Sequence, residues 1–304
     1  MSFDIPVLLL IFNRPATTKE VIKNLEKIKP RYLFVSADGP RQNVESDFEK
    51  CDTVRRIVVE NINWECEIKR NFREKNLGCK LGVSDGINWF FENVSEGIII
   101  EDDCLVDISF FNFCKELLIK YRDDERIMHI GAANFQDGKK RNKYSYYFSK
   151  MCHVWGWATW KRAWSKYDVT IQDFPEFVHE ERIKAIYSNS KIQKYFLRQF
   201  EKVFKNQLDT WDYQWVYTVW KHNGLSIIPN NNMVKNIGFH TEATHTKNMN
   251  SKLFLPRIEY SNEMITHPKF FLPDLEADYY TFRTKLYTSK IGKLINLMKR
   301  NKKN

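Results

Sequence analysis

The segment Gly97–Asp103, with the sequence GIIIEDD, decides the fold prediction for this chain. Three isoleucines run directly into three acids, and such a short apolar run is typical of a strand buried on both faces of a parallel sheet. Open α/β sheets bind ligands at the carboxyl ends of their strands, and hard divalent metal ions prefer oxygen ligands such as clustered carboxylates. The alternative is a solvated acidic turn that caps the helix predicted next.

Strand and helix patterns alternate on both sides of this segment. Further strands are predicted at Val7–Phe12, Tyr32–Ser36, Cys66–Phe72, Ile127–Ile130 and Gly224–Pro229. Helices are predicted from Thr17 to near Pro30 and at Phe48–Val59, Val83–Phe91 and Ile108–Tyr121. This alternation is typical of βαβ units, so we expect an α/β fold with a doubly wound, mainly parallel, Rossmann-like central sheet.

Polar side chains follow each of the first four predicted strands. They are Asn13 and Arg14, then Asp38, then Arg73 and Asn76, and finally Glu101, Asp102 and Asp103. Each residue alone has an ordinary explanation, because Asn, Asp and Gly form turns. Together at one sheet edge, they predict a site of nucleotide size, with a metal ion for the phosphates.

The net charge of +10 is unevenly distributed. Eight lysines and arginines, and no acid, lie between Thr281 and Asn304, whereas the rest of the chain holds 40 basic and 38 acidic side chains. A uniformly basic nucleic-acid-binding surface is therefore not indicated. The end of the chain resembles a basic amphipathic tail, which predicts contact with an anionic membrane surface; the equally open alternative is a frayed end that only solubilises the protein.

The sequence also predicts a compartment. The apolar run at Pro6–Phe12 is short and lacks a basic leader, so it is predicted to be a strand and not a signal peptide. No apolar stretch is long enough to span a bilayer. The six cysteines show no metal-ligand spacing, which suits a reducing cytoplasm. We expect a cytoplasmic protein that contacts the inner membrane face peripherally.

Tryptophans crowd the second half of the chain. Four of them lie between His153 and Trp164, and the spacing of Trp160 and Trp164 favours a core helix. The triplet Trp155-Gly156-Trp157 fits a helix poorly, because glycine weakens helices. Aromatic rings often stack on the apolar faces of sugars, so this triplet predicts a sugar pocket.

A single carboxylate, Asp212, lies among aromatic residues in the segment Trp211–Trp215. It is a candidate general base, and the alternative is an N-cap for a helix at Tyr213–Lys221. The preceding segment, Asp168–Tyr213, is predicted to be helical. Further on, His240 and His245 are secondary candidates for metal ligands.

The ordered motifs LLLIFNRP, VSADGP, NLGCKLGV, IIIEDDCL, HVWGWATWKRAW and WDYQW resemble bacterial nucleotide-diphospho-sugar transferases of the GT-A fold. The nearest variety is haemolytic-protein-like and distantly similar to N-acetylglucosaminyltransferase I. The resemblance implies a hexosyltransferase that uses Mn²⁺ or Mg²⁺ and a nucleotide-sugar, with UDP favoured, to glycosylate a hydroxyl of a glycan or lipid-linked acceptor. This chain departs from the family in one respect: its acidic motif is EDD, whereas DxD is commoner in such enzymes.

The resemblance also implies roles for individual residues. Asp103 is the expected metal ligand, and Asp212 is the base of an inverting reaction. The donor would be bound by Asn13, Arg14, Asp38, Arg73, Asn76, Lys80, Glu101 and Asp102. The acceptor or sugar pocket would be formed by Trp155, Gly156, Trp157 and Trp211.

The resemblance divides the chain into two parts. Residues 1–250 would form the transferase domain, with a nucleotide-sugar half at about 1–135 and an acceptor half at about 136–250. Residues 251–304 would form a helical C-terminal extension that ends in the basic tail.

Two other functions stay open. A sugar-nucleotide nucleotidyltransferase normally needs a glycine-rich first loop, which residues 13–17 lack, and a non-catalytic carbohydrate- or membrane-binding module leaves the polar strand ends unexplained.

Overall fold

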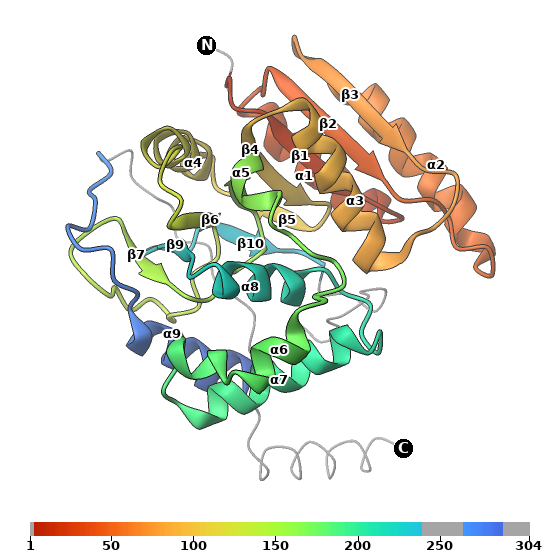
Figure 1. Cartoon of the computed structure of the whole chain (residues 1–304). Helices are drawn as coiled ribbons and strands as arrows, with labels where there is room; N and C mark the ends of the chain where they lie inside the picture. Colours follow the sequence, from red (N-terminus) through yellow and green to blue (C-terminus); the bar gives the residue numbers. More distant parts are fainter. Residues whose placement is uncertain (1–2, 239–263, 288–304) are drawn as a thin grey trace, which may run out of the picture.

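A computed structural model describes residues 3–238 and 264–287 of this chain. Within them, eight strands form one mixed sheet in the order β3-β2-β1-β4-β8-β6-β9-β7, with helices on both faces (Figure 1). The strands are β1 (Val7–Ile11), β2 (Tyr32–Ala37), β3 (Glu67–Phe72), β4 (Glu96–Glu101), β6 (Ile127–Gly131), β7 (Tyr146–Ser149), β8 (Trp157–Trp160) and β9 (Leu225–Pro229). The predicted doubly wound α/β fold is confirmed.

Strands β3, β2, β1 and β4 are parallel to one another, so their carboxyl ends share one edge. Every residue of β1 is buried, as expected for a central strand covered on both faces. The acids of the EDD motif lie at the end of β4 and in the turn after it. Their predicted position at the carboxyl edge of the parallel strands is therefore confirmed, whereas ligand binding at this edge stays a prediction.

Two hydrophobic clusters cover the two faces of the sheet. Alternate β1 residues point to opposite faces: Leu9 packs in the cluster with α1 (Pro15–Glu26), α2 (Glu45–Glu60) and α4 (Ile108–Lys120), whereas Leu8 packs in the other. The second cluster includes side chains of α3 (Gly78–Asn93), α5 (Lys161–Trp164), α6 (Phe174–His179), α7 (Ser190–Phe204) and α8 (Asp212–Lys221).

The second half of the sheet is built differently from the first. Strand β8 lies between β4 and β6 and is antiparallel to both, and β7 is antiparallel to β9. The helix expected from the spacing of Trp160 and Trp164 is therefore wrong, because Trp157–Trp160 form a strand and only α5 follows as one short turn. The helix expected over Asp168–Tyr213 is also wrong, because α6, the 3₁₀ turn η1 (Arg182–Ala185) and α7 are separated by bends.

The described part of the C-terminal segment packs against the sheet edge that holds β7. Helix α9 (Leu275–Thr281) continues into the π-helical turn η2 (Phe282–Leu286). The buried Asp278 carboxylate accepts hydrogen bonds from the Lys150 amide at 3.0 Å and the Tyr187 hydroxyl at 2.8 Å. Helix α9 lies within the C-terminal extension that was predicted to be helical, although no helix was predicted at these particular residues, and the boundary placed at residue 250 stays a prediction.

Two remaining findings concern the compartment predictions. Among the described residues, no helix combines the length and apolarity needed to cross a bilayer. All six cysteines are unpaired. The basic tail predicted beyond Tyr287 lies outside the described residues, so its contact with a membrane stays a prediction.

Candidate functional site

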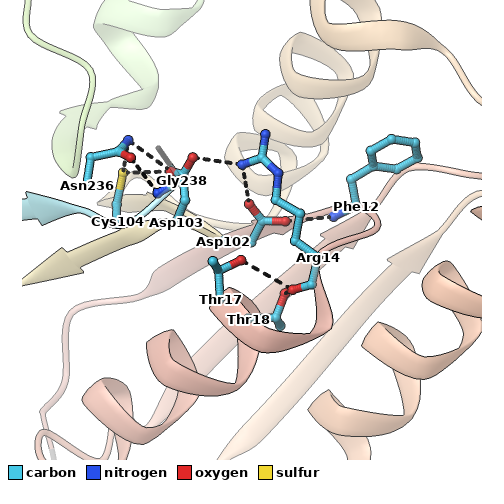
Figure 2. A network of polar contacts seen from close by, with 9 residues as sticks. All are labelled: Phe12, Arg14, Thr17, Thr18, Asp102, Asp103, Cys104, Asn236 and Gly238. Carbon is cyan, nitrogen blue, oxygen red and sulfur yellow. Dashed lines mark hydrogen bonds and ion pairs between the residues drawn. The ribbon is translucent and has the colours of Figure 1, made fainter. Parts of the chain in front are cut away.

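Arg14 lies between two carboxylates of the acidic motif (Figure 2). Its Nη1 atom donates to Asp103 Oδ2 at 2.7 Å and to Asp102 Oδ1 at 3.3 Å. Asp102 also accepts a hydrogen bond from the backbone amide of Phe12 at 3.3 Å. This bond links the residue after β1 to the turn after β4. The start of α1 orients Arg14, because the Thr18 hydroxyl donates to its carbonyl oxygen at 2.8 Å.

The cluster holds more negative charge than Arg14 neutralises. Burial, followed by the charges of Asp103 and Asp102, raises the pKa of Glu101 well above its usual range. Burial also raises the pKa of Asp102, although Arg14 opposes the shift. Burial alone would lower the pKa of Arg14, but the negative charges of Asp102 and Asp103 raise it. Three carboxylates around one guanidinium therefore form a site that favours additional positive charge.

The donor set fits a hard divalent cation that is bound together with a phosphorylated ligand. Within residues 3–238 and 264–287, no three His, Cys, Asp or Glu side chains converge to hold a metal by themselves. Mg²⁺ typically takes only one or two carboxylates and completes its coordination with water and substrate phosphates. Asp102 and Asp103 can supply that number of ligands.

A small two-stranded sheet, formed by segments far apart in sequence, brings a second loop next to Asp103. Strand β10 (Val234–Asn236) pairs antiparallel with β5 (Cys104–Val106), and Asn236 Nδ2 donates to Asp103 Oδ1 at 3.2 Å. Gly238 approaches so closely that an added Cβ would lie 2.2 Å from Asp103 Oδ2. Glycine at this position therefore permits the contact. The candidate ligands His240 and His245 lie outside the described residues.

A cavity of about 230 Å³ opens beside the acids, at the carboxyl ends of β1, β2 and β4. Of the residues predicted to bind the donor, five line it: Arg14, Asp38, Asn76, Glu101 and Asp102. Leu10, Ile11, Phe12 and Val83 contribute an apolar wall. The sequence-predicted strand exits thus converge on one cavity, and its combination of apolar and charged walls suits a base or sugar attached to phosphate.

The Asp38 carboxylate holds the start of α3 in place. It accepts hydrogen bonds from the amides of Leu77 at 3.0 Å and Gly78 at 3.2 Å, and from Asn76 Nδ2 at 2.9 Å. Burial nonetheless raises its pKa. Since several donors already occupy both oxygens, Asp38 shapes the cavity wall in this structure, and its contact with a donor stays a prediction.

Four other predicted residues do not line the cavity. Asn13 donates to Asp47 Oδ1 at 2.7 Å, Arg73 pairs with Asp85, Lys80 Nζ donates to Asn206 Oδ1 at 2.7 Å, and Asp103 faces Arg14 and Asn236. The first three pairs join the segments that surround the cavity. Their direct contact with a nucleotide-sugar is untested.

Two charged lining residues were missed by the sequence predictions. Arg41 lies with its guanidinium 5.5 Å from the centre of the Phe12 ring and pairs with the buried Asp47. Asp209 accepts from the amides of Cys79 at 3.1 Å and Lys80 at 2.8 Å, so it caps α3 from a loop 129 residues later in the chain. No local signal near Asp209 indicates a contact this distant in sequence.

Asp212 lies at the start of α8 and lines a second, smaller cavity of about 110 Å³. Its Oδ1 accepts from the Thr210 hydroxyl and from the Tyr213 amide, whereas no described residue donates to Oδ2. Burial is the main cause of the raised pKa of Glu101, and the negative charge of Asp212 makes a smaller contribution in the same direction. This cavity is mostly apolar and includes Phe135, Met151, His153, Tyr213, Val216 and Leu286.

Two of the tryptophans predicted to form the sugar pocket are buried in the core, which opposes their predicted role. Trp157 is 0% exposed and stacks on His129 and on Trp211, which is itself 3% exposed, so neither ring can offer a face to a sugar here. Gly156 is buried with φ +65°, and a Cβ there would lie 2.5 Å from Val106. Glycine at this position therefore allows the backbone to pass close to Val106 just before β8 begins. Trp155 is only half-buried, and its predicted sugar contact is untested.

No protein-family model matches the sequence, and no curated protein matches it. Solved structures resemble the fold weakly. A cytidylyltransferase from Leptospira borgpetersenii is 12% identical with a TM-score of 0.35; the alignment covers 55% of this chain and 64%, less than two thirds, of that chain. The mannosyltransferase PcManGT from Pyrobaculum calidifontis, solved with GDP-Man and Mn²⁺, is 12% identical with a TM-score of 0.34. That alignment covers 52% of this chain and 45% of that chain.

A third structure, a mannose-1-phosphate geranyltransferase from Thermus thermophilus, is 10% identical with a TM-score of 0.38. The alignment covers 75% of this chain and 73% of that chain. At these scores the likenesses carry no argument about chemistry, so the function must be inferred from the residues of this chain.

Proposed function

We propose that this protein is a metal-dependent glycosyltransferase that moves a sugar, of hexose type, from a nucleotide-sugar to an acceptor hydroxyl. The observation that carries the proposal is the cavity at the carboxyl ends of β1, β2 and β4, with Arg14 held between Asp102 and Asp103. A nucleoside diphosphate needs positive charge at its phosphates and an apolar wall for its base. UDP is the favoured nucleotide, on the resemblance of the sequence motifs.

The acidic motif would support departure of the diphosphate. Asp103, with Asp102 beside it, would hold a Mn²⁺ or Mg²⁺ ion, which when bound stabilises the negative charge that develops on the leaving group. Arg14 adds a fixed guanidinium to the same region, and its contacts with both carboxylates hold it in place. Glu101 would face the sugar end of the donor.

Asp212 would act as the general base. Its Oδ1 is held by Thr210 and Tyr213, which leaves Oδ2 to accept the proton of an acceptor hydroxyl. As the proton leaves, the acceptor oxygen attacks the anomeric carbon and the bond to the diphosphate breaks. A single displacement with one base inverts the anomeric centre. The small cavity that Asp212 lines would receive the acceptor.

The first loop favours this reaction over nucleotidyl transfer. Strand β1 ends at Ile11 and α1 begins at Pro15, so three residues, none of them glycine, join the two elements. A triphosphate is usually held by a longer, glycine-rich connection whose backbone amides point at the phosphates. Release of pyrophosphate from a nucleoside triphosphate and a sugar phosphate would favour the nucleotidyltransferase instead.

Thermal melting with a panel of nucleotide-sugars, with and without Mn²⁺, tests the proposal. A true donor present at 100 times its Kd should stabilise the fold by about 2.7 kcal/mol. Asp103→Ala should abolish sugar transfer and the Mn²⁺-dependent part of this stabilisation. The matched control is Asp52→Ala, which removes an exposed carboxylate on α2. Full activity of Asp103→Ala would contradict the metal assignment, and no stabilisation by any donor would contradict the function.

A further inference from the structure

Helix α7 carries a stripe of positive charge. Lys191, Lys194, Arg198 and Lys202 follow one another at spacings of three or four residues, so they lie on one face of the helix. The stripe is about 16 Å long, since an α-helix rises about 1.5 Å per residue. Among the described residues, no acid forms an ion pair with any of these four cations, whereas the neighbouring Lys205 pairs with Glu201 at 2.6 Å.

This stripe forms one wall of a groove of about 490 Å³. Tyr195, Leu286 and Tyr287 also line the groove, and none of the lining side chains is acidic. An exposed basic helix face often serves only to solubilise a protein. Here the like charges repel one another at helical spacing and line a concave surface, which is the arrangement of a binding site for an anion.

The groove adjoins the cavity that contains Asp212. Leu286 lines both, and the hydroxyl of Tyr195 in the groove lies 3.0 Å from that of Tyr213 in the cavity. The groove and the cavity are therefore neighbours, on either side of this tyrosine pair. The two sites are parts of one surface, formed by α7, α8 and η2.

We infer that the acceptor is an anionic glycan chain, bearing phosphate or carboxylate groups, which the basic groove on α7 holds while its end lies at Asp212. The inference rests on the proposed function for its link to an acceptor. A chain fits better than a flat lipid surface, because the cations line a concave groove of a volume that encloses ligands. Charge complementarity then selects acceptors that carry negative charge at a distance from the reacting hydroxyl.

Fluorescence anisotropy of the full chain with labelled, short inorganic polyphosphate tests the groove. The variant K194Q/R198Q removes two charges from the stripe, and the control K19Q/R56Q removes two exposed cations from α1 and α2. We expect K194Q/R198Q to bind polyphosphate about tenfold more weakly than the unaltered protein, since two solvent-exposed ion pairs with phosphate are lost. The control should bind normally, both variants should melt like the unaltered protein, and binding should weaken with added salt.

Equal affinity of K194Q/R198Q and the control for polyphosphate would overturn the inference. It would also be overturned if the stripe variant lost binding only to vesicles of phosphatidylglycerol and phosphatidylcholine, because the surface would then serve a membrane. Thermal stabilisation by a nucleotide-sugar is the separate readout for the proposed function. K194Q/R198Q should retain it, so loss of polyphosphate binding with intact donor binding locates the effect in the groove.

Discussion

Arg14 and Asp103 are joined by a 2.7 Å ion pair across 89 residues of sequence, between the loop after β1 and the turn after β4. Their side chains are 20% and 12% exposed, so the pair is only partly screened by solvent. The same guanidinium contacts Asp102. One cation therefore holds two carboxylates that would otherwise repel each other, at the edge of the sheet where the donor is proposed to bind.

Arg14→Gln should destabilise the protein by about 2 kcal/mol, less than is typical for a fully buried pair, because it leaves Asp102 and Asp103 without their cation. Urea denaturation measures this effect. Added Mn²⁺ should stabilise Arg14→Gln more than the unaltered protein, since a divalent ion can replace the lost charge. Arg56→Gln, which removes an exposed cation from α2, provides the control. Equal stability of the two variants would show that the ion pair contributes little.

Asp212→Asn should preserve donor binding and lower the rate of transfer by at least about 100-fold, since a positioned base typically contributes that much. The amide keeps the shape of the side chain but cannot accept the acceptor's proton. Steady-state transfer rates and donor-induced thermal shifts, measured on the same preparation, separate the two effects. Thr210→Val removes only the hydroxyl that contacts Asp212 and should retain most of the activity. Unchanged turnover by Asp212→Asn would assign the base to another residue.

Much of the first half of the site was predictable from sequence for a physical reason. An apolar strand that ends in polar residues is a local pattern, and parallel strands bring such ends to one edge without further information. Arg14, Asp38 and Glu101 could thus be assigned to the same site from the sequence alone. The ion pair between Arg14 and the acids could not, because a contact over 88 or 89 residues depends on side-chain orientation.

The second half was less predictable because its strands do not follow the βαβ rhythm. Strand β8 is inserted antiparallel between β4 and β6, and Trp157 and Trp160 become core residues on opposite faces of the sheet. Their spacing to Trp164 is compatible with a helix, so periodicity alone could not separate the two structures. Asp209 caps α3 from the other half of the chain, and the sequence predictions missed it. Its partners are backbone amides, which nearly every residue carries, so no sequence pattern indicates this contact.

Gly156→Ala should destabilise the protein by about 3 kcal/mol, because a Cβ would both strain the left-handed backbone and collide with Val106. Gly138 offers a matched comparison. It also has a positive φ, +83°, but no atom lies within 4 Å of an added Cβ. Gly138→Ala should therefore cost only the backbone strain, about 1 kcal/mol. Chemical denaturation of both variants isolates the collision, and equal losses would show that β8 can shift to accommodate the methyl group.

The buried His129 should make the protein sensitive to acid. Its Nδ1 accepts from Trp215 Nε1 at 3.2 Å, so Nε2 carries the proton and donates to the His153 carbonyl at 3.2 Å. Burial, followed by the charge of His153, lowers the pKa of His129 to about 3. The unfolded chain has a histidine pKa of about 6.5, so between these values the unfolded state binds the extra proton and stability falls as the pH falls.

The contribution of His129 to stability should therefore be complete at pH 7 and decrease by about 3 kcal/mol on acidification to pH 4, at about 1.36 kcal/mol per pH unit below 6.5. His129→Gln removes this titration, so its free energy of unfolding should fall less steeply over that interval, even if it is lower at pH 7. His179→Gln, which removes an exposed imidazole on α6, is the control. Parallel pH profiles for the unaltered protein and His129→Gln would mean that His129 is protonated in the folded state without cost, which its packing against Trp157 and Trp215 opposes.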